Sequence, residues 1–254
     1  MSSKVSIQNL EMEYTLKDRL VHALTDINLE IEDGEFLVVV GLSGCGKTTL
    51  LNILGGFFHP TGGSINLDGR PIEEAGRLNR AVVFQEYALF PWRTALGNVE
   101  FGLEMKGIQK EERLDIAMKY LELVHLEKFA NFYPHNLSGG MRQRVAVARA
   151  YAYEPEFLLM DEPFGALDAQ TREDLQSLTV EVWKKTKKTI FYVTHNLSEA
   201  VFLADRIIVL AGQPGVIHKE IKVDIPRSEE FKRDVFDPRF VELEKETTEA
   251  VRGN

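Results

Sequence analysis

The stretch Gly41-Leu42-Ser43-Gly44-Cys45-Gly46-Lys47-Thr48 decides the fold of this chain, because it matches the pattern G-x-x-x-x-G-K-[ST] in full. It follows an apolar, valine-rich run at residues 36–40 and precedes residues 48–54, which predict a helix. A strand that leads through glycines into a helix presents backbone N–H groups and a helix N-terminus to an anion. We therefore predict a phosphate-binding loop, with Lys47 placed to reach the β- and γ-phosphates of a nucleotide and the Thr48 hydroxyl placed to ligate Mg²⁺.

Cys45 is the only cysteine of the sequence and occupies a variable position of this loop. No nearby histidine pattern would activate its thiol, so we interpret it as a small filler rather than a catalytic nucleophile. A single cysteine can form no internal disulfide, and MSSKVSIQNLEMEY (residues 1–14) has no apolar core of signal-peptide length. Both features favour a cytoplasmic protein.

Composition limits the class of protein. The 254 residues include 30 Lys and Arg against 39 Asp and Glu, a formal net charge of −9, with 44% hydrophobic and 27% charged residues. This is the composition of a soluble globular protein of one large or two small domains. No apolar run approaches the roughly 20 residues that span a bilayer. The acidic balance argues against a broad nucleic-acid surface, so we expect no nucleic-acid partner.

Two carboxylates follow a second apolar run. FLLM (residues 157–160) leads directly into Asp161 and Glu162. On its own such a run is more often a strand end at the surface. Together with the glycine loop it predicts that Asp161 holds Mg²⁺ through water and that Glu162 polarises the attacking water as a general base.

A third segment, LSGGMRQR (residues 137–144), combines a serine with two glycines before a basic helical stretch. Ser138 can cap a helix that begins at Gly139, so that its hydroxyl and free N–H groups face an anion. An ordinary N-cap before a basic helix explains the segment equally well, and the residues leave both readings open.

The remaining pattern alternates strands with helices, which is typical of an α/β domain. Strands are predicted near residues 5–10, 27–31, 190–193 and 207–210, a hairpin at 64–67 and 70–72, and helices at 110–124, 171–185 and 197–203. The helix at 110–124 belongs to a mostly helical insert from about Gln85 to Tyr153. The last thirty residues are charged and carry only a weak helical pattern.

In their order these motifs resemble the ATP-binding cassette family, the ATPase subunits of ABC transporters, over about residues 5–221. Residues 41–48 resemble the Walker A loop, 157–162 the Walker B strand and 137–143 the LSGGQ signature, in which Met141 stands at the family's glutamine. The resemblance implies an α/β P-loop NTPase fold with a RecA-like core, an N-terminal antiparallel β subdomain and a helical insert. It implies one domain over residues 1–254, in which 1–84 and 154–224 form the β subdomain and core, 85–153 form the helical subdomain, and 225–254 form a charged extension.

The resemblance also assigns roles that the residues alone do not. Gln85 matches the Q-loop glutamine, GALD (residues 165–168) the D-loop and His195 the switch histidine, while Tyr14 is the candidate for stacking on adenine. The implied catalytic residues are Lys47, Gln85, Glu162 and His195. The implied nucleotide contacts are Tyr14, Gly41, Ser43, Gly44, Cys45, Gly46, Lys47, Thr48, Thr49, Ser138, Gly139, Gly140 and Asp168, and the implied metal contacts are Thr48, Gln85 and Asp161. A lone aromatic, a lone histidine or a Gln-Glu pair is usually structural, so these assignments depend on the complete set of motifs.

The family's chemistry implies ATP and Mg²⁺, a head-to-tail dimer with a second ATPase subunit, and a peripheral position on the cytoplasmic face of the membrane. Integral membrane permease subunits are the implied partners, together with an extracytoplasmic solute-binding protein acting indirectly. Residues 89–92, 141–144 and 162–172 resemble the narrower branch of nitrate, sulfonate and taurine importers. The ATPase subunit of an exporter is the alternative, and a non-transport soluble ATPase of the family is disfavoured because the insert lacks a sustained heptad.

One aromatic segment has two readings. QEYALFPWRTALGNV (residues 85–99) connects the predicted Mg²⁺ region to the helical insert. Its Tyr87, Leu89, Phe90, Pro91 and Trp92 would form either the core of the insert or a surface that receives a short helix of a membrane-embedded partner.

Overall fold

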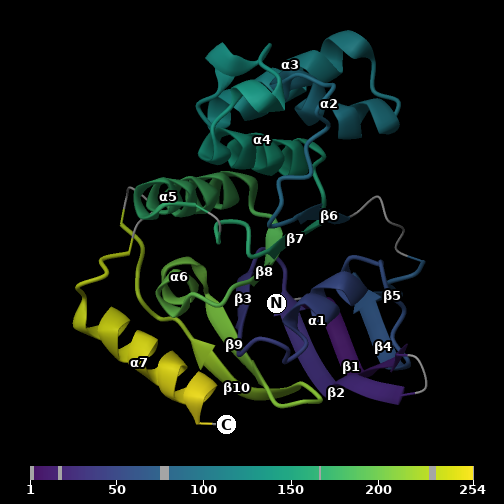
Figure 1. The fold of residues 1–254 in the computed structure, drawn as a ribbon, viewed down its shortest axis with the longest axis vertical. Helices are drawn as coiled ribbons and strands as arrows, with labels where there is room; N and C mark the ends of the chain where they lie inside the picture. Colours follow the sequence, from purple (N-terminus) through teal and green to yellow (C-terminus); the bar gives the residue numbers. More distant parts are fainter. Residues whose placement is uncertain (1–2, 17–18, 75–79, 166, 229–232, 254) are drawn as a thin grey trace.

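The structure, a computed structural model, describes residues 3–16, 19–74, 80–165, 167–228 and 233–253. Within these residues a central sheet has the strand order β10-β9-β3-β8-β7-β6 (Figure 1). Its strands are β3 (Phe36–Val40), β6 (Arg80–Val83), β7 (Phe157–Asp161), β8 (Thr189–Val193), β9 (Arg206–Ala211) and β10 (Val216–Lys222). All neighbours pair in parallel except β10, which lies antiparallel to β9 at the edge. The expected α/β class is thereby confirmed.

The central strands are unbroken apolar runs because both faces of the sheet are covered. Every residue of β3 and β8 is buried. Along β3, Phe36, Val38 and Val40 belong to one hydrophobic cluster, while Leu37 and Val39 belong to a second cluster on the other face. The sheet therefore divides two cores.

The second sheet is antiparallel and has the order β2-β1-β4-β5 within the described residues. Its strands are β1 (Ser3–Leu16), β2 (Arg19–Glu32), β4 (Gly62–Leu67) and β5 (Arg70–Pro71). The predicted hairpin is present: Leu67 pairs with Arg70, and both turn residues, Asp68 (φ 51) and Gly69 (φ 73), have the positive φ that a two-residue hairpin turn needs. The apolar side of this sheet packs with α1 (Lys47–Leu54) in the second core.

On the other face of the central sheet lie α5 (Ala169–Thr186) and α6 (Leu197–Leu203). The predicted bounds of α1, α5 and α6 agree with the structure within two residues. No helix in the described part of the chain is long and apolar enough to cross a membrane.

The helical insert stands apart at one end of the molecule (Figure 1). It contains α2 (Ala95–Met105), α3 (Lys110–Leu123), the 3₁₀ turns η2 (Glu127–Phe129) and η3 (Pro134–Asn136), and α4 (Gly139–Ala152). The buried Asn98 joins α2 to the connecting segment, because its amide nitrogen donates to the carbonyls of Phe90, Arg93 and Thr94 and its oxygen accepts from the Phe90 N–H.

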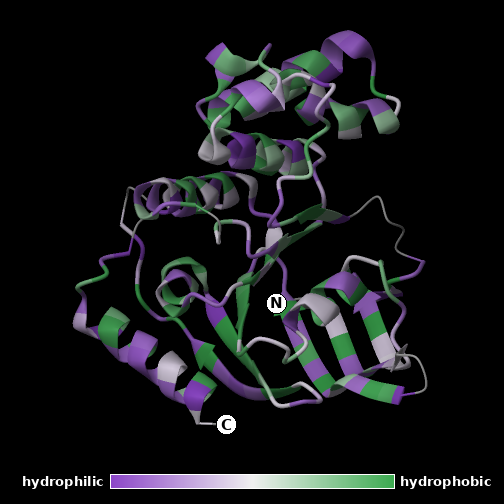
Figure 2. Ribbon diagram, in the orientation of Figure 1, coloured by the Kyte–Doolittle hydropathy of each residue, from purple (hydrophilic) through white to green (hydrophobic). Residues whose placement is uncertain are grey.

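Residues 238–252, in the charged segment whose sequence showed only a weak helical pattern, form the regular helix α7 (Pro238–Arg252). Its buried residues, Phe240, Leu243, Thr247, Ala250 and Val251, recur at helical spacing. Hydrophilic and hydrophobic bands alternate along α7 in Figure 2. α7 is an amphipathic helix that packs against α6 and β9. Its pattern is weak in the sequence because charged residues lie among the buried positions.

Candidate active site

The three motifs predicted to be catalytic meet because their strands are neighbours in the parallel sheet. Residues 41–46 follow β3, His195 follows β8 and Glu162 follows β7. Val193 pairs with Val39 on one side and with Asp161 on the other, so the three strands end at the same level. Ligands of open α/β sheets bind beyond such carboxyl ends.

The glycine loop is closely packed around the Lys47 ammonium group. Lys47 Nζ donates to the carbonyl oxygens of Gly41 at 2.9 Å and of Leu42 at 3.0 Å. Gly46 has φ 93, and a Cβ there would lie 2.5 Å from a methyl carbon of Leu24. Only glycine therefore fits this position, where the loop enters α1.

The thiol of Cys45 is 3% exposed, and burial raises its pKa above the ordinary range. A thiol that is buried and protonated is unreactive. This agrees with the interpretation of Cys45 as a packing residue of the loop.

A hydroxyl and two carboxylates lie together beside the loop. Thr48 Oγ1 donates to Asp161 Oδ1 at 3.4 Å. Burial raises the pKa of Asp161, and the adjacent Glu162 carboxylate raises it further, while Thr48 and Lys47 act in the opposite direction. Oxygen donors with unfavourable negative charge suit a hard divalent cation such as Mg²⁺, which would relieve that repulsion.

The Glu162 carboxylate contacts His195 directly. His195 Nδ1 lies 2.7 Å from Glu162 Oε2, and the side chain of His195 is 66% exposed against 23% for Glu162. Glu162 adopts φ 43, a left-handed conformation, while its N–H donates to the Val193 carbonyl at 2.9 Å. The chain thus turns immediately after β7 and directs the carboxylate toward the segment after β8, where it can accept a proton from water.

A cleft of about 590 Å³ opens over the loop. It is lined by Tyr14, Val21, His22, Ala23, Ser43, Gly44, Gly46, Lys47, Thr48, Thr49, Glu162, His195 and Gln213. Tyr14 is half-buried, its hydroxyl donates to Thr49 Oγ1 at 3.5 Å, and its ring meets Phe58 edge to face. Most of the residues predicted from the sequence to contact nucleotide therefore line one cavity.

Sequence reasoning missed part of this lining. Val21 pairs with Tyr14 in the ladder between β1 and β2. The register of this hairpin would therefore have predicted Val21, His22 and Ala23 as lining residues of the cleft. Gln213 follows β9, and its amide approaches the Gly44 carbonyl at 3.5 Å. No sequence signal marks Gln213.

Gln85 lies outside the cleft lining but close to Glu162. A Cβ on Gly165 would lie 3.4 Å from Gln85 Nε2 and 3.8 Å from Glu162 Oε2, so the two side chains approach the same glycine. Of the D-loop segment, residue 166 lies outside the described residues, and Asp168 accepts from the Thr171 N–H as the cap of α5.

Ser138, Gly139 and Gly140 do not line the cleft either. Ser138 is exposed and caps α4 by accepting from the Met141 N–H at 3.3 Å. A Cβ on Gly140 would lie 2.4 Å from Thr171 Cγ2, so this helix end packs against the start of α5. Within one chain, the signature segment therefore does not contribute to the cleft over the glycine loop.

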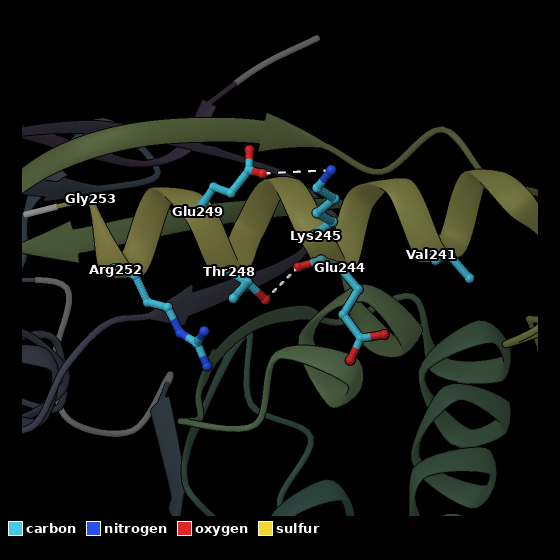
Figure 3. A pocket seen from close by; sticks show the side chains of 7 residues that line it. All are labelled: Val241, Glu244, Lys245, Thr248, Glu249, Arg252 and Gly253. Atoms are coloured by element: carbon cyan, nitrogen blue, oxygen red, sulfur yellow. Dashed lines mark hydrogen bonds and ion pairs between the residues drawn. The ribbon is translucent and has the colours of Figure 1, made fainter.

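A second hollow, of about 650 Å³, lies along the outer side of α7 (Figure 3). Its side chains are mostly long and charged, and Lys245 pairs with Glu249 at 3.9 Å. This is a solvated helix face, and it contains none of the predicted site residues.

Comparison with known proteins agrees with this geometry. The family model described as ABC transporter matches residues 24–165. A nitrate import ATP-binding protein of Synechocystis is 44% identical over 254 residues, covering 98% of this chain and 95% of the relative. A taurine import ATP-binding protein of Pelagibacter ubique is 51% identical over 224 residues, covering 87% and 83%. A dimeric ATP-binding cassette solved in a post-hydrolysis state with ADP and Pi superposes with a TM-score of 0.76 at 37% identity, covering 86% of this chain and 98% of that chain.

Proposed function

Because this chain belongs to the ABC transporter family and is an ATPase of that family, we propose that it energises an importer of a small anionic solute such as nitrate, sulfonate or taurine. The proposal is carried by one observation: the Glu162–His195 pair lies in the same cleft as the glycine loop. The names of the nitrate and taurine relatives support the importer class and the kind of solute.

In this proposal the glycine loop and Lys47 bind the β- and γ-phosphates of ATP, and the half-buried Tyr14 stacks on the adenine. Thr48, Gln85 and Asp161 would hold Mg²⁺, Asp161 through water, and the ion would offset the charge of the phosphates. The described residues form no cluster of three or more His, Cys, Asp or Glu side chains able to hold a metal on their own. This fits an ion that keeps waters and phosphate oxygens among its ligands.

Glu162 accepts the proton of the attacking water, and His195 keeps its carboxylate in place. With Glu162 ionised, the Nδ1–H of His195 donates to Oε2, so the carboxylate's other oxygen is available to the water. Removing either side chain should slow hydrolysis without preventing nucleotide binding.

A second subunit completes the site. Ser138 is exposed at the start of α4 and lies away from the cleft, while its helix end has the free N–H groups that bind anions. We place this helix end against the γ-phosphate held by the partner, so that ATP closes the dimer and hydrolysis opens it. Intact Ser138 and Gly140 support ATP binding despite Met141 in the signature.

The surface for the membrane permease is proposed at the connecting segment. Phe90 packs against Phe101 at 4.5 Å between ring centroids, with the Arg149 guanidinium 5.8 Å from its centroid. Phe90 is half-buried by these contacts. The Trp92 ring also contacts Phe90, at 5.6 Å between centroids, but Trp92 itself is 71% exposed. Trp92 is the residue available to a short helix of a permease subunit on the cytoplasmic face of the membrane, where the protein would be peripheral.

The test is to identify the membrane subunit that co-purifies with the chain and to measure ATP hydrolysis and solute uptake in liposomes. We expect nitrate, a sulfonate or taurine, presented with its solute-binding protein, to stimulate both. Stimulation only by a solute on the ATP side, with outward transport, would replace the importer with an exporter.

A further inference from the structure

A buried carboxylate lies behind the segment that carries His195. Glu199, in the first turn of α6, is 5% exposed, and both of its oxygens accept hydrogen bonds. The Thr194 hydroxyl donates to Oε2, and Gln176 Nε2 on α5 donates to Oε1 at 3.0 Å. Burial raises the pKa of Glu199, and these two donors act in the opposite direction.

The residues before and after His195 in the chain, Thr194 and Asn196, are both held by hydrogen bonds. Thr194 N–H donates to the Val39 carbonyl at 3.2 Å, which anchors the segment to the strand before the glycine loop. The Thr194 hydroxyl also accepts from the Asn196 N–H at 3.0 Å, across His195. Asn196 Oδ1 in turn accepts from the Glu199 N–H at 3.1 Å. The exposed imidazole thus stands on a backbone turn whose polar groups are bonded to one another and to Glu199.

The same carboxylate reaches a second motif. Gln176 lies about two turns along α5 from Asp168, the residue that caps this helix. Through Gln176 and Thr194, Glu199 connects the helix of the D-loop with the turn of His195. A shift of α5 would therefore move the turn that carries the His195 imidazole, through the hydrogen bonds that Gln176 and Thr194 donate to Glu199.

We propose that Glu199 is a positioning residue, which holds the turn at Thr194 so that His195 keeps its contact with Glu162. The inference rests on the catalytic role proposed for His195. It predicts a loss in the rate of the chemical step rather than in affinity for ATP, because Glu199, unlike Glu162 and His195, does not line the cleft.

The experiment compares kcat and KM for ATP in the full chain. We expect Glu199→Ala and Thr194→Val each to lower kcat on the order of 10-fold, with KM unchanged within about twofold. Glu199→Gln should recover most of kcat, since its amide oxygen can still accept from Thr194 and its NH₂ can donate to a rotated Gln176 amide. Thr247→Val in α7 removes another fully buried hydroxyl and should leave kcat unchanged.

The decisive comparison uses His195→Ala as the background. If Glu199 acts through His195, Glu199→Ala should cause no further loss there. An equal fold-loss with and without His195, or an unchanged kcat in Glu199→Ala, would overturn the inference. If Glu199→Ala does not fold, the nearly isosteric Thr194→Val decides in the same background. If His195→Ala hydrolyses ATP at the wild-type rate, the proposed role of His195 fails and this inference fails with it. If His195→Ala loses activity but Glu199→Ala does not, only this inference is overturned.

Discussion

His195 Nδ1 lies 2.7 Å from Glu162 Oε2, although 33 positions separate the two residues in the sequence. The contact follows from strand pairing: β7 and β8 are adjacent, Asp161 pairs with Val193, and each of the two residues lies just beyond its strand. The proposed general base and its partner are therefore held by the most buried part of the sheet. Such a pair needs little reorganisation at the moment of reaction.

The first prediction concerns Glu162→Gln. The amide keeps the size of the side chain but cannot accept a proton, so we expect kcat to fall by about 10²- to 10⁴-fold. Nucleotide binding should persist because Lys47 and the loop are unchanged. With ATP and Mg²⁺ the variant should accumulate as a stable dimer, measured by light scattering after size exclusion.

The control for that experiment is Lys47→Ala, which should neither bind ATP nor dimerise. A Glu162→Gln protein that hydrolyses ATP at the wild-type rate would show that another group is the base. A protein that binds ATP but stays monomeric would contradict the closing of the dimer by ATP.

The second prediction uses the raised pKa of Asp161. In the folded state a proton binds this carboxyl more readily than in the unfolded chain, so stability is lost as pH rises from the ordinary value of 3.8 through the raised one. Without nucleotide, Asp161→Asn should therefore raise Tm at pH 7, by roughly 2 °C after allowance for its partial exposure. The gain should disappear as pH falls well below 3.8, where both side chains are neutral.

Two comparisons make this result specific to Asp161. Asp168, another of the predicted nucleotide contacts, has a lowered pKa through its bond from the Thr171 N–H, so Asp168→Asn should not raise Tm at pH 7. With ATP and Mg²⁺ the order should reverse, because only the wild type gains the stability of the bound complex. A lower Tm for nucleotide-free Asp161→Asn would refute the electrostatic argument.

The sequence predicted the strands and the loop between β3 and α1 correctly where one strand leads directly into a motif. The run before Asp161 and the loop after residue 40 gave the correct strands, and their common edge follows from parallel pairing. Residues that tertiary contacts bring to the site were not predicted. Gln213 contacts Gly44 from the segment after β9, and Glu199 has no motif of its own. The amphipathic face of α7 was not predicted because its buried positions lie among charged residues, Glu242, Glu244, Lys245, Glu246 and Glu249.

The third prediction tests whether two chains share each site. Ser138→Asp can still cap α4 but places a negative charge where the partner's γ-phosphate is proposed to lie, so this variant should be inactive. Lys47→Ala should be inactive for lack of phosphate binding. In an equimolar mixture, only a dimer that carries both variants has one intact composite site, so the mixture should hydrolyse ATP although neither variant does so alone.

The mixture is measured as ATPase activity per chain against each variant alone. Ser138→Thr, which keeps the capping hydroxyl without the charge, is the control and should retain activity. If the mixture is as inactive as its components, Ser138 and Lys47 act within one chain or do not share a site.

The last prediction separates the two aromatic residues of the connecting segment. Phe90 contacts Phe101 and Arg149, so Phe90→Ala should cost about 3 kcal/mol or less, given its partial burial, and lower Tm visibly. Trp92→Ala removes a 71% exposed ring and should leave Tm nearly unchanged.

In the reconstituted complex, however, Trp92→Ala should lower solute uptake more than it lowers ATP hydrolysis by the isolated chain, because the lost contact is with the permease. Phe236, 87% exposed and outside the segment, provides a matched control, and Phe236→Ala should leave uptake unchanged. Equal uptake by Trp92→Ala and the wild type would remove Trp92 from the proposed permease surface.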